Sequence, residues 1–221
     1  VTSNQASLRD YFQSIPGLTV GPSVGAIPET AVVIRGISGG SFGSPTVGFT
    51  IDDVPFTYPG GNVGNIIPDL DPSEIARVEI LRGPQGTLYG ASSMGGLVKY
   101  VTVEPSLSEV SGRVTAGISA VAHGDAGYNV SGSLIIALTS DLAMRVSGFN
   151  RVEPGYIDNI VTGRSDVNEM RSYGGHVSLL YRPTSNLTIK LGALYQKKKA
   201  EAIGQVQTGP GIGDLEQTFY E

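Results

Sequence analysis

The residue types needed for catalysis are present in this sequence, but their spacing does not form an active site. Residues 83–90 have glycines at the spacing of a phosphate-binding loop, yet no Gly-Lys-Ser/Thr ending supplies the lysine that reaches phosphate. Neither Ser92 nor Ser93 has glycine two residues away on both sides, as a nucleophile elbow requires. We therefore expect that the protein is not an enzyme, and a soluble α/β enzyme is the most distant alternative.

Residues that bind metals are scattered in the same way. The two histidines, His123 and His176, have no clustered ligands near them in sequence, and the chain has no cysteine. This favours structural or solvated histidines over metal or catalytic ones. Two close pairs of aspartates, near residues 53 and 70, lack calcium-loop spacing and fit turns instead. We expect no metal site and no cofactor, and the net charge of −5 argues against nucleic acid as a partner.

The most informative segment, residues 76–102, predicts a strand, a glycine-rich turn and a second strand. The first strand ends at Gly83 and Pro84, because proline lacks the backbone donor that a sheet needs. Four further glycines allow a positive φ or a close backbone approach: Gly86, Gly90, Gly95 and Gly96. Either another surface lies close to this turn, or the glycines only make it flexible.

Mixed helix and strand patterns precede residue 105. Residues 8–15 place apolar side chains at helical spacing and predict a short amphipathic helix. Strands are predicted at 31–35 and 47–51, and a capped helical turn at 71–75. This alternation within about a hundred residues, a common domain size, predicts a compact α+β domain.

After residue 105 the pattern alternates with a period of two, apolar on one side and polar or small on the other. Five segments are predicted as strands: 113–120, 128–138, 142–147, 173–182 and 187–196. Their length suits strands that cross a bilayer at a tilt, and no run is apolar and long enough for a membrane-spanning helix. A soluble antiparallel sheet with one face on a core gives the same alternation, so the pattern leaves both open.

After the first hairpin, the connections between these strands alternate between short and long. Residues 139–141 and 183–186 predict tight turns, whereas residues 150–168 and the stretch from 197 onward are long and polar. Outer-membrane barrels have short periplasmic turns and longer external loops, so the first, third and fifth strands would run outward. Four tyrosines lie near strand ends on the apolar face, as an aromatic girdle would require: Tyr128, Tyr173, Tyr181 and Tyr195.

Several motifs resemble, in the right order, the plug domain of the TonB-dependent outer-membrane receptors. They are residues 15–20, Val33-Ile34-Arg35-Gly36, Ile51-Asp52-Asp53-Val54-Pro55, and the segment from Leu81-Arg82-Gly83-Pro84 through Gly96. Asp53 stands where the family usually has glycine, and aspartate tolerates turn geometry.

This resemblance implies an α+β plug domain at residues 1–105, followed at 106–221 by antiparallel transmembrane strands of an incomplete β-barrel. A barrel with a plugged lumen has about 22 strands, so five cannot close it. We expect the N-terminal fragment of a longer protein, with the signal peptide and the TonB-contacting box upstream. The expected location is the outer membrane of a Gram-negative bacterium, and the expected partners are TonB, outer-membrane lipid and a small nutrient.

The function that the resemblance implies is import of a scarce nutrient into the periplasm with energy transmitted by TonB. A ferric siderophore or another iron complex is the expected substrate. Two alternatives remain: a ligand-sensing signalling receptor of the same architecture, and an importer of a non-iron substrate such as cobalamin or an oligosaccharide.

The resemblance also suggests roles for individual residues. Arg35 and Arg82 are expected to contact carboxylates of the barrel wall, unless they are ordinary surface arginines at turns. The signature turn positions are Gly36, Asp52, Gly83, Gly90 and Gly96. Loops 38–45 and 57–65 are predicted as outward apices, unless they are merely flexible. Their candidate substrate-facing residues are Phe42, Tyr58 and Asn62.

Overall fold

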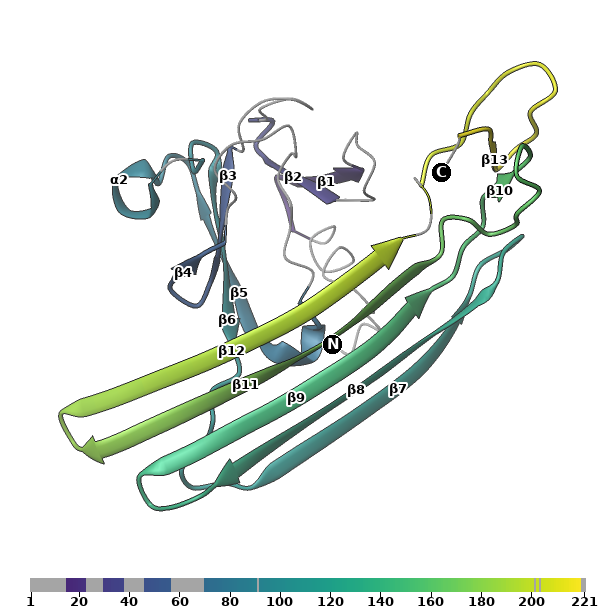
Figure 1. Cartoon of the computed structure of the whole chain (residues 1–221). Helices are drawn as coiled ribbons and strands as arrows, with labels where there is room; N and C mark the ends of the chain where they lie inside the picture. The colour runs from purple at the N-terminus through teal and green to yellow at the C-terminus, as the bar shows by residue number, and fades with distance from the viewer. Residues whose placement is uncertain are drawn as a thin grey trace. The chain divides into compact units, whose positions relative to one another are not determined.

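A computed structural model describes residues 15–22, 30–37, 46–56, 70–90, 92–200, 202 and 204–219. The chain separates into two compact units, Val1–Val103 and Glu104–Glu221 (Figure 1). The helix expected at residues 8–15 lies outside the described part, apart from its last residue.

A four-stranded mixed sheet forms the centre of the first unit. Its order is β4-β3-β6-β5. The strands are β3 (Val47–Ile51), β4 (Val54–Pro55), β5 (Ile75–Arg82) and β6 (Gly96–Thr102). β3 and β6 run parallel, while β4 and β5 pair antiparallel with their neighbours. A separate antiparallel pair consists of β1 (Leu18–Pro22) and β2 (Thr30–Ile34). The strands predicted in this half are confirmed as β2, β3, β5 and β6, whereas β1 and β4 were not predicted.

Apolar side chains of the strands, together with Leu70 before η1, make the core of this unit. The buried members are Leu18, Val32, Ile34, Val47, Phe49, Leu70, Val98 and Tyr100. The rings of Phe49 and Tyr100 stack with their centroids 6.4 Å apart. Since each buried side chain of this size contributes roughly 1.5–3 kcal/mol, the cluster is the main source of the unit's stability.

Two short helices flank β5. The predicted capped turn is the 3₁₀ helix η1 (Pro72–Glu74), where the Asp71 carboxylate accepts a hydrogen bond of 2.9 Å from the backbone N–H of Ser73. The helix α2 (Gly86–Tyr89) lies inside the glycine-rich turn, where the sequence predicted only a turn.

The second unit is an antiparallel five-stranded sheet in the order β12-β11-β9-β8-β7 (Figure 1). Its strands are β7 (Ser111–Ala120), β8 (Ala126–Ala137), β9 (Leu142–Glu153), β11 (Met170–Thr184) and β12 (Leu187–Ala200). All five predicted strands are confirmed, but β9 is six residues longer than predicted. The last residues of β9 are mostly polar, so the sequence shows no clear alternation there. Pairing with β11 nevertheless continues as far as Glu153, which lies opposite Met170.

The two long connections of this unit are folded against each other. β10 (Asp158–Asn159) lies between β9 and β11, and β13 (Glu216–Gln217) follows β12. They pair in parallel. No helix in the part of the chain that the structure describes is long and apolar enough to span a membrane.

Candidate functional site

The first signature turn follows β2. Arg35 has φ 52° and Gly36 has φ 76°, so two consecutive residues take the left-handed conformation. The turn is closed by a hydrogen bond of 3.0 Å from the Ile37 backbone N–H to the Ile34 carbonyl. The Arg35 backbone N–H donates to the Gly17 carbonyl at 3.0 Å, which ties the turn to the start of β1, and its side chain is exposed.

Arg82, at the end of β5, contacts a segment of the same unit that is distant in sequence. Its Nη2 donates to the backbone carbonyl of Pro16 at 2.9 Å. The arginine therefore helps to fix the turn before β1, a local role that the sequence did not predict. Contact of Arg35 and Arg82 with a barrel wall stays a prediction.

Asp52 is the acceptor at the second signature turn. It has φ 53°, and its carboxylate accepts from the Thr102 backbone N–H at 2.8 Å and from the Thr102 hydroxyl at 3.0 Å. Its own N–H donates to the Tyr100 carbonyl at 2.7 Å. One side chain thus joins the end of β3 to the end of β6.

Asp53 lies in this turn, as its explanation from sequence requires, but the left-handed residue of the turn is Asp52. Asp53 instead pairs with Lys99, with the Nζ and Oδ1 atoms 2.6 Å apart. The hydrogen bond to Asp53 raises the pKa of Lys99 above its ordinary value, against the opposing effect of burial. Since the Asp53 side chain is 90% exposed, solvent screens this pair and it contributes little stability.

Substitution should distinguish the structural roles of these two neighbouring aspartates. Asp52→Ala removes two acceptors and places alanine at a positive φ, so we expect a loss of about 2–3 kcal/mol in the local stability of β6. Asp53→Ala should cost less than about 0.5 kcal/mol. Amide hydrogen exchange of residues 96–102 in the full-length protein measures both, and equal effects would contradict the assignment.

The glycines of the third signature turn differ in their surroundings. Gly83 and Gly90 have φ values of 94° and 75°, with open space where a Cβ would lie. Gly96 has φ 151°, and a Cβ there would come within 2.4 Å of the Leu81 carbonyl oxygen and 2.8 Å of Ile34 Cδ1. The close approach that the glycines suggested is therefore found at Gly96, against strands of its own unit.

The residues proposed to face substrate, Phe42, Tyr58 and Asn62, lie outside the described residues. Their role stays a prediction.

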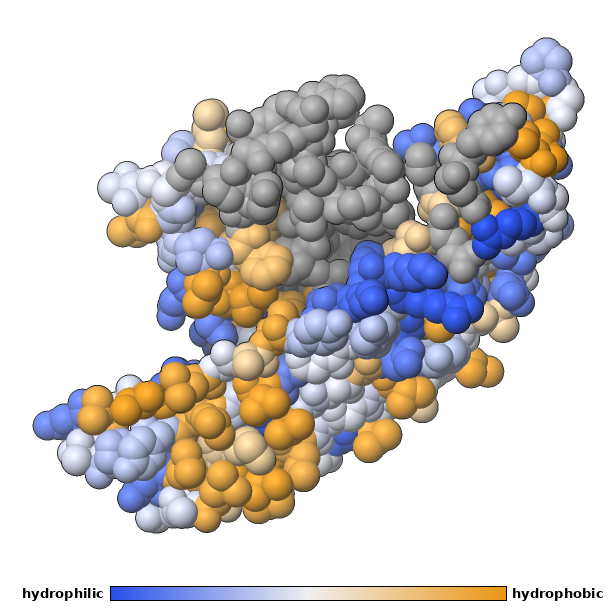
Figure 2. Space-filling model, in the orientation of Figure 1, coloured by the Kyte–Doolittle hydropathy of each residue, from blue (hydrophilic) through white to orange (hydrophobic). Residues whose placement is uncertain are grey.

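The sheet of the second unit exposes its apolar face. Strand pairing places on one face a set of exposed apolar side chains: Val114, Ile118, Val130, Leu134, Val146, Val177, Ile189 and Leu191. The four predicted girdle tyrosines are on the same face and partly exposed. Figure 2 shows hydrophobic side chains gathered along these strands. A soluble sheet would bury this face, so the exposure favours the membrane alternative.

The opposite face of the same sheet is mostly polar and buried at its centre. Arg145 is only 1% exposed, and Arg151 and His176 are also buried. Arg145 Nη1 donates to Ser147 Oγ at 3.0 Å, and that hydroxyl donates to the His176 carbonyl at 3.2 Å. Arg151 Nε lies 3.1 Å from Glu153 Oε1. Buried cations supported by polar partners are typical of a barrel interior rather than of a lipid surface.

Sequence reasoning missed Arg145 and Arg151 as members of this face, and it proposed a solvated His176 as one possibility. The signal was available, because both arginines occupy odd-numbered positions of β9, opposite in parity to Met144 and Val146.

The loops at the end of this sheet where the long connections lie carry a group of acidic side chains. Burial raises the pKa of Asp166 above its ordinary value, and the carboxylates of Asp125, Asp158 and Glu169 raise it further. A carboxyl with a raised folded-state pKa favours the folded loop most at low pH, and this advantage falls as the pH rises through that pKa. No group of three or more metal-ligating side chains occurs among the residues described.

Asp166→Asn should therefore slow amide hydrogen exchange of residues 154–169 at neutral pH. Asparagine tolerates the φ of 57° at this position and keeps the backbone N–H bond to Asp158, so the change removes only the cost of burying the charge and its repulsion by the neighbouring carboxylates. We expect a slowing of roughly two- to fivefold at pH 7 and none near pH 3. The same change at Asp141, in the short turn before β9, is the control, and an equal effect there or at pH 3 would contradict the proposed cause.

Comparison with known proteins gives consistent matches. Residues 2–97 match the family model of the TonB-dependent receptor plug domain. The chain is 33% identical over 170 residues to the pesticin receptor of Yersinia pestis, covering 76% of this chain and 24% of that protein. It is 30% identical over 172 residues to the hemin receptor of Yersinia enterocolitica, covering 76% and 22%.

Among solved structures, the ferric yersiniabactin uptake receptor from Yersinia pestis matches with a TM-score of 0.74 at 25% identity. The match covers 88% of this chain and 29% of that one. The chain spans about a quarter of the length of the pesticin receptors that it matches.

Proposed function

Because this chain belongs to the TonB-dependent receptors, we propose that it is the N-terminal part of an outer-membrane transporter that imports an iron complex with energy from TonB. Two of the similar proteins are named for hemin and for ferric yersiniabactin, which are both iron compounds, and a third is named for pesticin. This supports a ferric siderophore or another iron complex as the substrate of the whole protein.

The observation that carries this proposal is the sheet of the second unit, whose apolar face is exposed and whose polar face is buried at its centre. That arrangement fits a wall between lipid and an aqueous interior. The location of the chain in the outer membrane of a Gram-negative bacterium follows from its family.

The tyrosines of β11 indicate where the sheet would lie between the two surfaces of the membrane. Tyr173 and Tyr181 lie on the exposed apolar face and are eight residues apart in one strand. At about 3.4 Å per residue and a tilt of about 40°, they are separated by roughly 20 Å along the membrane normal. This is close to the apolar band of about 25 Å that aromatic girdles border. We place the end with the long connections, and therefore Tyr173, at the outer surface.

Individual residues of the plug also have proposed roles, in substrate binding and in holding the plug. Phe42, Tyr58 and Asn62 are proposed to face the substrate, and Arg35 and Arg82 to hold the plug in its barrel. The support for these roles is the order of the family motifs in the sequence.

Uptake in cells tests this function. A strain that lacks the complete gene should lose accumulation of a radiolabelled ferric siderophore under iron restriction, and so should a strain without TonB. Uptake that survives both deletions would overturn the proposal. Loss of a transcriptional response with no loss of uptake would favour the signalling receptor, and loss of cobalamin uptake alone would favour the non-iron substrate.

A further inference from the structure

The polar face of the second sheet is cationic, although the chain as a whole has a net charge of −5. Glu153 Oε1 lies 3.1 Å from Arg151 Nε, and Glu104 forms an ion pair with Lys190. Along the strands of this face, cations nevertheless outnumber carboxylates, so charge is distributed unevenly within the chain. Strand register places on this face the following basic side chains: Arg113, Arg145, Arg151, Lys190 and Lys198.

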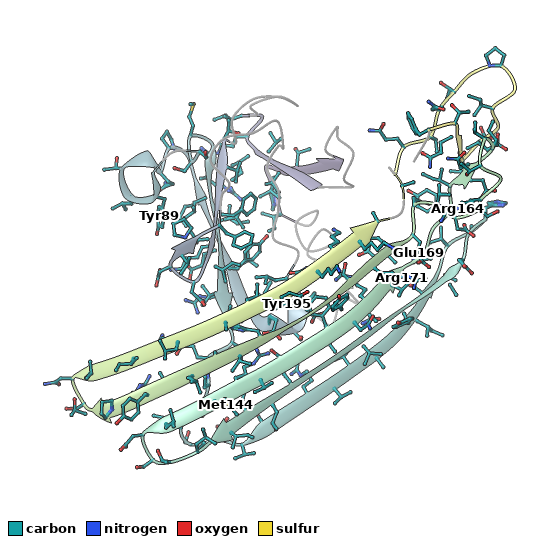
Figure 3. The ribbon with its side chains drawn as sticks, viewed as in Figure 1. Tyr89, Met144, Arg164, Glu169, Arg171 and Tyr195 are labelled. Atoms are coloured by element: carbon teal, nitrogen blue, oxygen red, sulfur yellow. The ribbon has the colours of Figure 1, made fainter. Side chains whose placement is uncertain are left out.

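Two of these cations lie nearest to the end of the sheet where the long connections begin. One is Lys198, which is two residues before the end of β12 and pairs with Ser172, next to Tyr173. Because Tyr173 is placed at the outer surface, Lys198 lies at about the same level but on the polar side of the wall. Its side chain is exposed. In Figure 3 this level lies between Tyr195 and Arg171, which is itself close to the start of the long connections.

A row of hydrogen-bond donors crosses four strands at this level. Lys198 on β12 is opposite Ser172 on β11, which is opposite Arg151 on β9. Asn129 on β8 continues the row opposite Arg151. Neighbouring strands lie about 4.8 Å apart, so the row extends over roughly 14 Å. Each of these side chains can donate a hydrogen bond, and such a row suits a ligand that presents several negatively charged oxygen atoms.

We infer that this row attracts and binds an iron complex that carries a net negative charge, through the oxygen atoms of its carboxylate or catecholate groups. The inference rests on the proposed function and on the proposed outward direction of β12, and it narrows the substrate to anionic complexes. Charges of one sign along a passage with low-dielectric walls raise the local concentration of an oppositely charged ligand and speed its association. A neutral or cationic iron complex would gain nothing from this row.

Equilibrium binding to the purified full-length receptor in detergent tests this inference. The probes are ferric enterobactin and hemin, which are anionic, ferrioxamine B, which is cationic, and cyanocobalamin, which is neutral. We expect the wild-type receptor to bind an anionic probe, and Lys198→Gln to weaken that binding about fivefold at low ionic strength. The difference should disappear at about 1 M salt, because screening is then strong.

Lys197→Gln is the matched control for this experiment. It removes an adjacent charge of the same kind, but Lys197 is opposite Tyr173 and therefore lies on the apolar face. Binding of the anionic probe should stay unchanged in this variant.

The outcomes decide the inference separately from iron import. Unchanged binding in Lys198→Gln, an equal loss in Lys197→Gln, or a wild-type receptor that binds neither anionic probe would overturn it. Binding of ferrioxamine B alone would overturn the inference and leave import of an iron complex standing. Binding of cyanocobalamin alone would contradict both.

Discussion

Val177→Lys should prevent stable insertion of the full-length receptor into the outer membrane. Val177 lies at the middle of the exposed apolar face, between Val146 on β9 and Ala193 on β12. A lysine at the midplane of a transmembrane barrel costs about 2–4 kcal/mol, because its charge must leave water. If water rather than lipid covered this face, the same change at Val177, which is 40% exposed, would be nearly neutral. The equilibrium stability of the receptor folded into lipid vesicles measures the difference.

Val206→Lys is the matched control for this experiment. Val206 is an exposed valine that lies after β12, in the long connection rather than in a strand. The same change of residue should therefore have little effect there. A stable Val177→Lys variant in vesicles would contradict the membrane orientation of the sheet.

Gly96→Ala should unfold the centre of the plug. The new Cβ would lie 2.4 Å from a backbone oxygen of β5, which cannot rotate away, and alanine is strained at a φ of 151°. Because overpacking and backbone strain act together, we expect a loss of at least about 3 kcal/mol in the local stability of β5 and β6. Amide hydrogen exchange of residues 75–82 and 96–102 in the full-length receptor measures it.

Gly83→Ala distinguishes backbone strain from overpacking as the cause of this loss. Gly83 also has a positive φ, but a Cβ there meets open space, so only the strain of about 1 kcal/mol remains. Equal effects of the two substitutions would show that close packing at Gly96 is not the dominant cause.

The sequence predicted the strands of both units because each carries a local signal. Period-two alternation marks β7, β8, β9, β11 and β12, and short apolar segments bounded by glycine and proline mark β3, β5 and β6. The parallel pairing of β3 with β6 was not predictable in this way, since it joins residues almost fifty positions apart. The pairing of β10 with β13 has the same cause, because two dipeptides in polar loops have no periodicity.

Site residues were predictable by type but not by partner. The sequence singled out Arg82 and Asp52 at strand ends. It could not show that Arg82 reaches the carbonyl of Pro16 or that Asp52 caps Thr102, because both contacts depend on long-range strand order. It also could not decide which face of the second sheet is buried. Alternation assigns side chains to two faces, but it does not show whether water, lipid or protein covers each face.

The paired loops of the second unit have a consequence for their motion. Asn159 accepts hydrogen bonds from the N–H groups of Val161 and Thr162 in its own loop, and its Nδ2 donates to the carbonyl of Phe219 in the other loop at 2.8 Å. Gln217 is fully buried and pairs with this asparagine, so we expect the two loops to open and close as one cooperative unit. A molecule that displaces one loop would therefore have to release the other, and the two should exchange their amide protons at a common rate.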